Sequence, residues 1–479
     1  MARRPRTSPD PRNDRVPATT ARPRPPPTVH DAPRHPADAA DAATSGADGP
    51  PRQTPPVAPG RGTEVAADAS TAPDAGPPLR VVILNQYYWP DVASTGHLLH
   101  ELANDLARRG VAVSVLTARP SYGPPETWQP APRRERTNGV YVERMITTRF
   151  SKDNIVGRVL NSITFLAPLT LRVLLRPSRD EVFLYTTNPP YLGIIGALVS
   201  RFRRHPYVVL LHDSYPHIAV LIGKLRRGGL VERLWHRVNR SIYHRAEQTI
   251  VLCDRAKELV CRDYDVDPST IHVIPNWADG TKLYPIPKKD SPFAREHGLL
   301  DAFTVLYSGN LGLYYEFETI LGAAERLRDE PFRLVLVGAG GKREWIRREI
   351  ERRGLDNALL LPYQPFETLN ESLNACDASL VTIARGVEGI SFPSKLYSSL
   401  AVGKPIIALS EPESELRDIV DRDHVGRWLE LGDADGVAEA CREMMRDPAA
   451  CHRMGGNARR LFERRYNLEA AGAAYAGVL

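Results

Sequence analysis

Short apolar runs alternate with longer stretches of helical pattern along most of this chain, in two successive series. The first series starts at Leu79 and continues to about residue 280, before the Pro- and Lys-containing segment Tyr284–Pro292. The second series starts at Phe303. Strands that alternate with helices form parallel sheets with helices on both faces. The sequence therefore predicts an α/β protein with two doubly wound domains.

The apolar runs have the length of buried strands, and several stretches between them have the length of helices. In the first series we expect a helix over His97–Arg109 and strands over Arg80–Leu84, Val111–Thr117, Val182–Tyr185, Val208–Leu211, Thr249–Leu252 and His272–Ile274. In the second we expect helices over Phe317–Leu327 and Lys342–Arg353, and strands over Phe303–Tyr307, Phe332–Gly338, Leu359–Leu361, Ala378–Ile383 and Pro405–Leu409. Ligands of such sheets bind at the carboxyl ends of the strands.

The first 78 residues differ in composition from the rest of the chain. They contain 18 of the 42 prolines and no Leu, Ile, Phe, Tyr or Trp. A segment without large apolar side chains cannot offset its chain entropy by burial. We therefore expect a disordered Pro/Ala/Arg-rich tail over residues 1–78.

Five scattered cysteines indicate neither a zinc site nor a disulfide framework, and they favour a reducing compartment. With no signal-peptide core near the start, we expect a cytoplasmic protein. The most apolar stretch, Ile155–Leu175, is interrupted by Arg158, Asn161, Pro168 and Arg172. Its longest charge-free part is shorter than the roughly 20 residues that a spanning helix needs, so it is not expected to cross a membrane.

Two common nucleotide-binding signatures are missing where they would be diagnostic. The first strand runs into Asn85–Pro90 with only Gly96 before the next helix, so the G-x-G-x-x-G of a nicotinamide dehydrogenase is absent. The chain also lacks the Walker G-x-x-x-x-G-K-[ST] pattern. Isolated glycines at strand-to-helix turns remain, and these let phosphates or sugars approach backbone N–H groups.

Seven spaced segments in one order form a more specific signal. They are Asn85–Pro90 with Ser94–Gly96, Thr187–Tyr191, Leu211–Pro216, Ile274–Asp279, Tyr307–Gly312, Val337–Gly340, and Glu388–Lys395 leading to Gly403–Pro405. On these segments the chain from Leu79 to its C-terminus resembles the family 4 glycosyltransferases of the GT-B fold. Within that family it resembles bacterial surface-polysaccharide sugar transferases of the fucosaminyltransferase-like type.

The resemblance implies two Rossmann-like domains that face each other across a cleft. It implies an acceptor domain over residues 79–280, a nucleotide-sugar donor domain over 281–465, and a C-terminal helix over 466–479 that returns to the N-terminal domain. The implied reaction moves a sugar from a nucleotide-diphosphate donor to an acceptor with retention of anomeric configuration. No cofactor and no metal ion are implied, because bases and helix dipoles stabilise the diphosphate in this family.

The donor-binding residues are expected in loops that follow strands of the second series. Many relatives carry a base after the first of these loops, but this chain has leucines there, so the positive charge must come from elsewhere. Lys342 and Lys395 are the candidates; a solvated surface lysine is the alternative for Lys395. The remaining donor-side candidates are Gly309, Asn310, Gly338, Gly389, Ile390, Ser391 and Ser398, together with Gly96 of the first domain.

Relatives bind the donor with two glutamates seven residues apart, and this chain departs from that pattern. If Glu388 is the first, the second position falls on Leu396. If Gly403 sets the register instead, the two positions are Ile390 and Ser398. Glu388 is therefore the one acidic side chain expected to meet the donor sugar.

The acceptor side is expected at His212 and Asp213, which directly follow the strand Val208–Leu211. A His or Asp at that edge can orient hydroxyl groups or stabilise charge at the reacting centre. The alternative is a capping aspartate beside a structural histidine.

Basic residues surround apolar ones in two stretches of the first series. The first is Val159–Leu171, flanked by Arg149, Lys152, Arg158, Arg172, Arg176 and Arg179; the second runs from Lys224 to Arg245 and includes Leu230, Leu234 and Trp235. Such faces suit an anionic membrane surface and a lipid-linked acceptor, which predicts a protein peripheral to the inner face of the cell membrane. Internal helices with solvated charges are the alternative, and no nucleic-acid motif accompanies the charge.

Two further functions stay open beside sugar transfer in polysaccharide or glycolipid assembly. A nucleotide-sugar epimerase of the same fold would need no acceptor. A pseudoenzyme that only binds nucleotide sugar is suggested by the absent second glutamate and the absent loop base.

Overall fold

A computed structural model describes residues 79–479 of the chain except residues 92, 123–127, 151–154, 177–179 and 204. The predicted tail over residues 1–78 lies outside the described residues, as do Lys152 and Arg179 of the first basic stretch.

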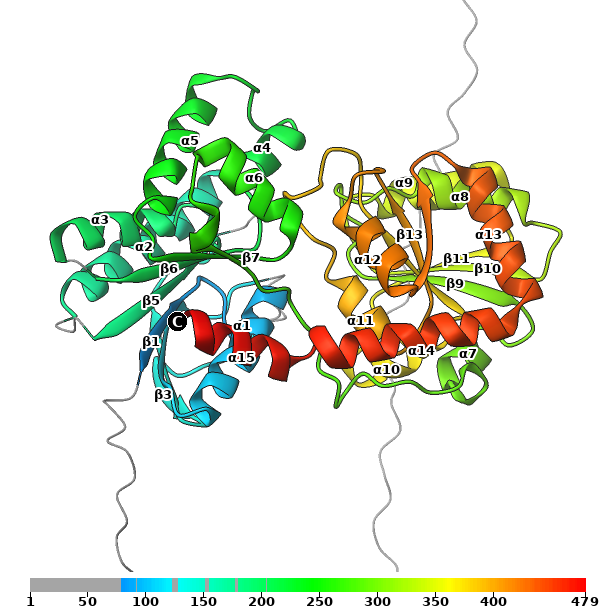
Figure 1. Cartoon of the computed structure of the whole chain (residues 1–479), viewed down its shortest axis with the longest axis horizontal. Coiled ribbons are helices and arrows are strands. Elements are labelled where there is room, and N and C mark those ends of the chain that lie inside the picture. The colour runs from blue at the N-terminus through cyan, green and yellow to red at the C-terminus, as the bar shows by residue number, and fades with distance from the viewer. Residues whose placement is uncertain (1–78, 92, 123–127, 151–154, 177–179, 204) are drawn as a thin grey trace, which may run out of the picture. The chain divides into compact units, whose positions relative to one another are not determined.

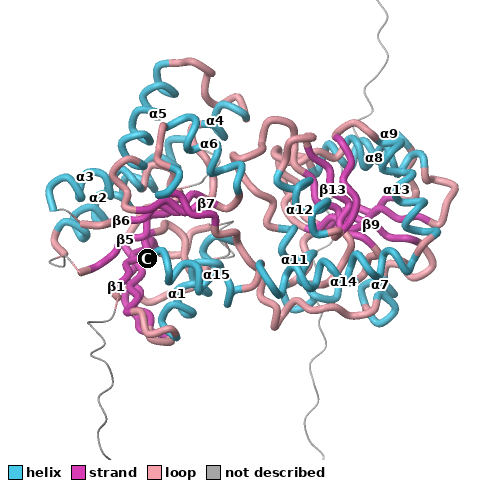
Figure 2. The backbone as a smooth tube through the Cα atoms, in the orientation of Figure 1, coloured by secondary structure: helices cyan, strands magenta, loops and turns pink. Residues whose placement is uncertain are grey.

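In the described part of the chain, eight strands form the N-terminal sheet in the order β3-β4-β2-β1-β5-β6-β7-β8 (Figures 1 and 2). The strands are β1 Arg80–Leu84, β2 Ala112–Ala118, β3 Arg134–Thr137, β4 Val140–Met145, β5 Glu181–Thr186, β6 Tyr207–Leu211, β7 Gln248–Val251 and β8 Ile271–Val273. All neighbouring strands are parallel except β3 and β4, which are antiparallel.

Helices cover both faces of this sheet. Apolar residues of α1 (Ser94–Arg108) and α15 (Leu468–Val478) pack with one set of strand side chains. The alternate set packs with α2 (Ile155–Leu174), α3 (Gly193–Arg203), α5 (Leu230–Tyr243) and α6 (Asp254–Tyr264). The short helix α4 (His217–Leu221) precedes α5, and a 3-10 turn over Pro268–Thr270 precedes β8.

Six strands form the C-terminal sheet among the described residues, all parallel, in the order β11-β10-β9-β12-β13-β14. They are β9 Phe303–Ser308, β10 Phe332–Val337, β11 Ala358–Leu361, β12 Ala378–Thr382, β13 Ile406–Ser410 and β14 Gly426–Glu430. One face is covered by α8 (Glu318–Arg326), α9 (Arg343–Arg353) and α13 (Ala434–Arg446). The other is covered by α7 (Pro292–Glu296), α10 (Leu369–Asn374), α11 (Lys395–Ala401), α12 (Glu415–Asp423) and α14 (Pro448–Arg465).

The two sheets confirm the prediction of two doubly wound α/β domains. The expected strands are present with boundaries that differ by at most one residue, but β3, β4 and β14 were not predicted. β3 is a polar edge strand of sequence RERT, and β14 is a half-exposed edge strand, so neither has the continuous apolar pattern of a buried strand. The antiparallel pairing of β3 also corrects the expectation of a purely parallel sheet.

The C-terminal helix α15 packs against α1. Tyr475 and Ala471 belong to the apolar cluster on that face, and Tyr475 contacts the ring of Trp277 edge-on. Arg109 donates a hydrogen bond to the carbonyl of Glu469 at 2.9 Å. The chain thus uses its last residues to complete the packing of the N-terminal sheet.

None of the helices in the described ranges is both long and apolar enough to cross a membrane. The helix α2 is the longest, and Pro168 lies inside it.

Candidate functional site

The strand order reverses beside β1 in the first sheet and beside β9 in the second. The chain passes from β1 to β2 on one side and returns to β5 on the other, and β9 lies in the same way between β10 and β12. Loops after these strands diverge at such points and leave room for a ligand. The candidate site residues lie in or near loops that follow β1, β5, β6, β9, β10 and β12.

The first of these positions is held together by buried polar side chains. Thr186 donates a hydrogen bond to the side-chain oxygen of Asn85 at 2.6 Å, which ties the end of β5 to the end of β1. The next residue, Thr187, accepts hydrogen bonds from the backbone N–H groups of His212 at 3.2 Å and Asp213 at 3.3 Å. The Thr187–Tyr191 segment therefore fixes the backbone of the acceptor-side pair.

His212 is neutral at physiological pH. Burial lowers the pKa of its imidazole to about 4, against a smaller opposing effect of a hydrogen bond with Asn276. Its Nδ1 atom is buried and has no hydrogen-bond partner among the described residues. A buried ring nitrogen without a partner is costly unless a bound molecule satisfies it. His212 therefore cannot supply a positive charge at neutral pH, and its Nδ1 atom keeps an unused hydrogen-bonding position.

Asp213 connects the two halves of the candidate site. Its carboxylate accepts a hydrogen bond from the hydroxyl of Ser391 at 2.9 Å, and the backbone N–H of Ser214 donates to the carbonyl of Ile390 at 2.9 Å. Burial raises the pKa of Asp213, and the Ser391 hydrogen bond opposes that rise. The structure thus brings together Asp213, Ile390 and Ser391, which the sequence had assigned to different sides of the reaction.

Gly389 lies against the N-terminal domain. It has a φ of +71°, and a Cβ there would lie 2.7 Å from the carbonyl oxygen of Arg255 at the start of α6. This close approach, more than a loose turn, explains the glycine. Gly96 has a similar role within α1: a Cβ there would lie 3.2 Å from backbone atoms of Tyr87 and Tyr88. Gly96 lets the loop after β1 pack on the helix.

The two glycine loops after β9 and β10 are packed directly on each other. The N–H groups of Gly309 and Leu311 donate to the carbonyls of Val337 and Ala339 at 2.9 and 2.8 Å. These N–H groups are therefore already occupied, and α8 begins only at Glu318. Gly309 and Asn310 are therefore not at a strand-to-helix turn, which corrects the expectation that the glycines of these loops lie at such turns. Gly338, with a φ of +148°, has no room for a side chain because a Cβ would lie 1.9 Å from the carbonyl oxygen of Gly309.

Lys395 is buried beside the Gly309 loop. Its side chain is 8% exposed, and its Cε would lie 3.4 Å from a Cβ placed on Gly309. Burial lowers the pKa of its amine to about 7, and none of the charged groups in the described chain contributes to that pKa. A buried ammonium group without a counter-ion is a place where an anion would be stabilised.

The other candidate base, Lys342, is already hydrogen-bonded. Its amine donates to the backbone carbonyl of Tyr315 at 2.5 Å. Burial lowers the pKa of the amine, and Glu316 opposes this. Lys342 and Lys395 therefore contact the same residue, Tyr315: Lys342 at its backbone carbonyl and Lys395 at its ring.

Glu388 faces the N-terminus of α12. Its carboxylate accepts a hydrogen bond from the N–H of Glu415 at 3.0 Å. Burial raises the pKa of Glu388 to about 7, while that hydrogen bond lowers it and the Glu415 charge raises it. Lys395 is not among the charges that act on Glu388, and Arg255 is. In the described chain, no hydrogen bond or ion pair joins Glu388 and Lys395. Ser398, one turn along α11, donates its hydroxyl to the carbonyl of Lys395 at 3.0 Å.

Three residues that shape the site were not among the site residues predicted from the sequence. Thr187 holds the backbone of the acceptor-side pair, and Tyr307 and Tyr315 surround the Lys395 amine. A usable signal was the double tyrosine Tyr314–Tyr315, placed shortly after the glycine turn where many relatives carry a base. In the described part of the chain, no three His, Cys, Asp or Glu side chains gather in a way that could hold a metal ion.

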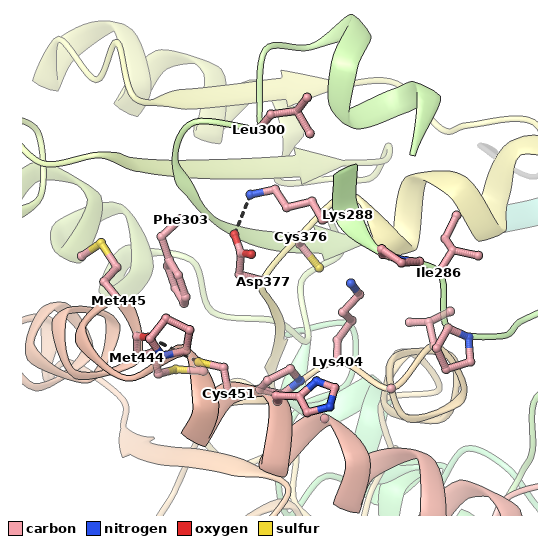
Figure 3. A pocket seen from close by; sticks show the side chains of 18 of the residues that line it. Ile286, Lys288, Leu300, Phe303, Cys376, Asp377, Lys404, Met444, Met445 and Cys451 are labelled. Atoms are coloured by element: carbon pink, nitrogen blue, oxygen red, sulfur yellow. Dashed lines mark hydrogen bonds and ion pairs between the residues drawn. The ribbon is translucent and has the colours of Figure 1, made fainter. Parts of the chain in front are cut away.

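A cavity of about 930 Å³ lies at the opposite edge of the C-terminal sheet (Figure 3). Its lining includes Phe303, Asp377 and Pro405, which stand at the amino ends of β9, β12 and β13. Lys288 also lines the cavity, and its amine forms an ion pair with Asp377 at 2.6 Å. The glycine loops and Lys395 are associated with the carboxyl ends of the strands, so this cavity is separate from the candidate site.

Comparisons with known proteins agree with this architecture. The model of the glycosyl transferase 4-like domain matches residues 95–277, and that of the group 1 glycosyl transferases matches residues 291–461. Among relatives, WbjE of Pseudomonas aeruginosa, named as a glycosyltransferase, is 26% identical over 347 residues, which cover 72% of this chain and 84% of WbjE. WcaI of Escherichia coli K12, named as a colanic acid biosynthesis glycosyl transferase, is 26% identical over 72% of this chain and 86% of its own length.

Solved structures show the same fold. A sucrose-phosphate synthase from Thermosynechococcus elongatus superposes with a TM-score of 0.66 at 17% identity, over 83% of this chain and 98% of its own. HepE of Anabaena, solved with UDP-glucose, superposes with a TM-score of 0.62 at 16% identity and the same coverage. Together, the two family models span most of the described residues, one on each sheet. The chain belongs to the glycosyltransferases of the GT-B fold, with a 4-like N-terminal domain and a group 1 C-terminal domain.

Proposed function

We propose that this glycosyltransferase takes its sugar from a nucleotide-diphosphate donor and transfers it with retention of anomeric configuration. The observation that carries the proposal is Lys395, a buried amine without a carboxylate partner among the described residues, beside the Gly309 loop. A diphosphate would supply the missing counter-charge. The fold shared with HepE, which was solved with UDP-glucose, supports this class of donor.

In this proposal the other candidate residues lie either on the donor side or on the acceptor side of the reaction. Gly309, Asn310, Gly338 and Lys342 shape the loops beside Lys395, and Asp213 and His212 meet the acceptor hydroxyl. Glu388 and Ser398 flank the donor sugar and ribose. Glu388 already accepts a hydrogen bond from the N–H of Glu415, so it must give up this contact with α12 to bind a sugar hydroxyl. Its pKa of about 7 favours this exchange, because a protonated carboxyl accepts that hydrogen bond less strongly than a carboxylate does.

A thermal-shift screen of the purified chain against UDP, GDP and dTDP sugars tests the donor class, because tight binding raises the melting temperature. Transfer to a lipid-extracted acceptor distinguishes a transferase from an epimerase, which would isomerise the donor alone. Binding without transfer or donor hydrolysis would indicate a pseudoenzyme.

For the acceptor side, we expect Asp213→Asn to lower kcat about 100-fold while donor affinity stays within about twofold of the wild type. The amide keeps the shape of the side chain but removes the charge that can polarise an acceptor hydroxyl. Steady-state kinetics with varied donor and acceptor checks this. Ser391→Ala is the matched control, since it removes only the 2.9 Å hydrogen bond and should cost about 3- to 10-fold.

We further propose that the acceptor is lipid-linked, and that the enzyme binds the cytoplasmic face of an anionic membrane during polysaccharide or glycolipid assembly. WcaI, named for colanic acid biosynthesis, supports this setting. The supporting surface is on α3 and α5, where Phe202 is 74% and Leu230 is 84% exposed. Exposed Arg233 and Arg237, without carboxylate partners in the described chain, flank the apolar residues of α5.

Not all the predicted basic residues are available to lipid headgroups. Arg172 pairs with Glu143 at 2.9 Å, Arg176 with Glu181 at 3.0 Å, and Arg240 with Asp265 at 2.7 Å. The proposal therefore rests on the α5 surface more than on α2.

We expect the double substitution Leu230→Ser, Leu234→Ser to weaken binding to phosphatidylglycerol-containing vesicles at least about tenfold, because two large apolar side chains no longer enter the lipid. Sedimentation at low salt measures this binding, and transfer to a soluble acceptor should not change. Leu300→Ser, at an exposed position of the C-terminal domain, is the control. Equal sedimentation of wild type and double variant would refute the membrane proposal.

A further inference from the structure

The amine of Lys395 is held by aromatic rings. It lies 3.5 Å from the ring centroid of Tyr315 and 4.7 Å from that of Tyr307. Both distances are within the range of a cation–π interaction, which strengthens when the cation is desolvated. The rings occupy the place where a buried lysine would ordinarily have a carboxylate.

Both rings are themselves fixed by the fold. Tyr307 is in β9 and fully buried, and its hydroxyl donates to the carbonyl of Asn310 at 2.6 Å. Its ring packs edge-on against Tyr315 with centroids 6.0 Å apart, and against Phe317 at 4.9 Å. The backbone carbonyl of Tyr315 is held by Lys342. The backbone of Tyr315 is therefore anchored by Lys342, and its ring packs between the Tyr307 ring and the Lys395 amine.

An aromatic ring differs from a carboxylate in what it leaves available. A carboxylate would neutralise the ammonium and compete with an incoming diphosphate for it. A ring face attracts the ammonium through its quadrupole and carries no net charge, so it does not cancel the charge of the protonated amine before a ligand binds. This arrangement keeps the lysine in place and still able to bind an anion.

We propose that Tyr315 is a positioning residue for the donor diphosphate: its ring holds the Lys395 amine beside the Gly309 loop, and its carbonyl holds Lys342. The proposal rests on the proposed nucleotide-diphosphate donor. It identifies the double-tyrosine segment as the element that takes over where relatives carry a basic residue after the glycine turn.

Three variants test this assignment by isothermal titration calorimetry with the nucleoside diphosphate that the wild type binds most tightly. Tyr315→Phe keeps the ring and should bind within about twofold of the wild type. Tyr315→Leu removes the ring face and should bind about 5- to 30-fold more weakly. Tyr284→Leu changes an exposed tyrosine of the interdomain linker and should have no effect.

Steady-state kinetics distinguish a positioning role of Tyr315 from a general loss of activity. In Tyr315→Leu the KM for the donor should rise by the same factor as the dissociation constant, while kcat at saturating donor stays within about threefold. A fall in kcat with unchanged KM would contradict the proposal, as would equal binding by the Leu and wild-type proteins. Equal losses of binding in the Phe and Leu variants would assign the role to the Tyr315 hydroxyl instead of its ring, and would also overturn the proposal.

If Tyr315→Leu does not fold, Tyr315→Met, with a flexible side chain that fills space, takes its place and the same factors are expected. If the wild type binds no nucleoside diphosphate while the melting curves show folded protein, the proposed donor class fails, and this inference fails with it. Binding by the wild type with no loss in either variant refutes the inference alone.

Discussion

Replacing Lys395 by methionine is expected to lower kcat/KM for the donor about 100- to 1000-fold and at the same time to stabilise the protein. The loss of activity follows because a desolvated ammonium that pairs with a diphosphate is removed and its phosphate partner is left unpaired. The gain in stability follows because folding must strip water from this amine without giving it a carboxylate. Methionine has similar length and no charge.

The stability effect has a defined pH dependence. Burial lowers the pKa of Lys395 from 10.5 to about 7, so the unfolded chain binds the proton more tightly than the native protein. The penalty is therefore complete below about pH 7 and declines as the pH rises towards 10.5. Thermal melting of both proteins across this interval measures it, and the advantage of Lys395→Met should shrink at alkaline pH. An unchanged or lower melting temperature at neutral pH would show that Lys395 has a counter-ion in solution.

The substitution Gly338→Ala is expected to cost more than about 3 kcal/mol and to abolish donor binding. Its Cβ would lie 1.9 Å from the carbonyl oxygen of Gly309, at a φ of +148° that residues with side chains rarely adopt. The two glycine loops would have to separate, and the Lys395 amine would no longer lie beside the Gly309 loop. Unfolding in urea, followed by the fluorescence change of the C-terminal domain, measures the loss.

A neighbouring glycine provides the matched comparison. A Cβ on Gly341 would make only ordinary contacts, 3.8 Å from Leu313. Gly341→Ala should therefore change stability by less than about 0.5 kcal/mol and leave donor binding intact. If both variants behave alike, the close contact between the loops is absent in solution.

Much of the fold could be predicted because buried parallel strands have a local signature. Runs such as Val208–Leu211 are apolar at every position, since both faces of a parallel strand are covered. Two of the three strands that were not predicted, β3 and β14, stand at sheet edges, where pairing replaces hydrophobicity as the main stabilising interaction; the third, β4, lies inside the sheet next to β3. The order of motifs also identified the family, because loops at the carboxyl ends keep their place along the chain.

The site was less predictable because its contacts join residues far apart in sequence. Nothing local to Asp213 indicates that Ser391 will donate to it. Glu388 was expected at the donor sugar, but its carboxylate accepts the N–H of Glu415, a helix end 27 residues further along the chain. Lys395 was predicted as a base for the diphosphate, but the rings of Tyr307 and Tyr315 that contact its amine come from β9 and the loop after it, about 80 residues earlier in the chain. Sequence pattern reports which residues are available, and packing decides what they meet.

The return of α15 to α1 sets the order in which the protein can mature during synthesis. Side chains Ala471 and Tyr475 complete the apolar cluster on one face of the first sheet. The part of that face beneath α15 stays uncovered while the ribosome makes the second domain, and it is covered only after residues 468–478 have left the exit tunnel. The first domain is therefore completed only after the second domain has been made, and deleting residues 468–478 would destabilise the N-terminal sheet.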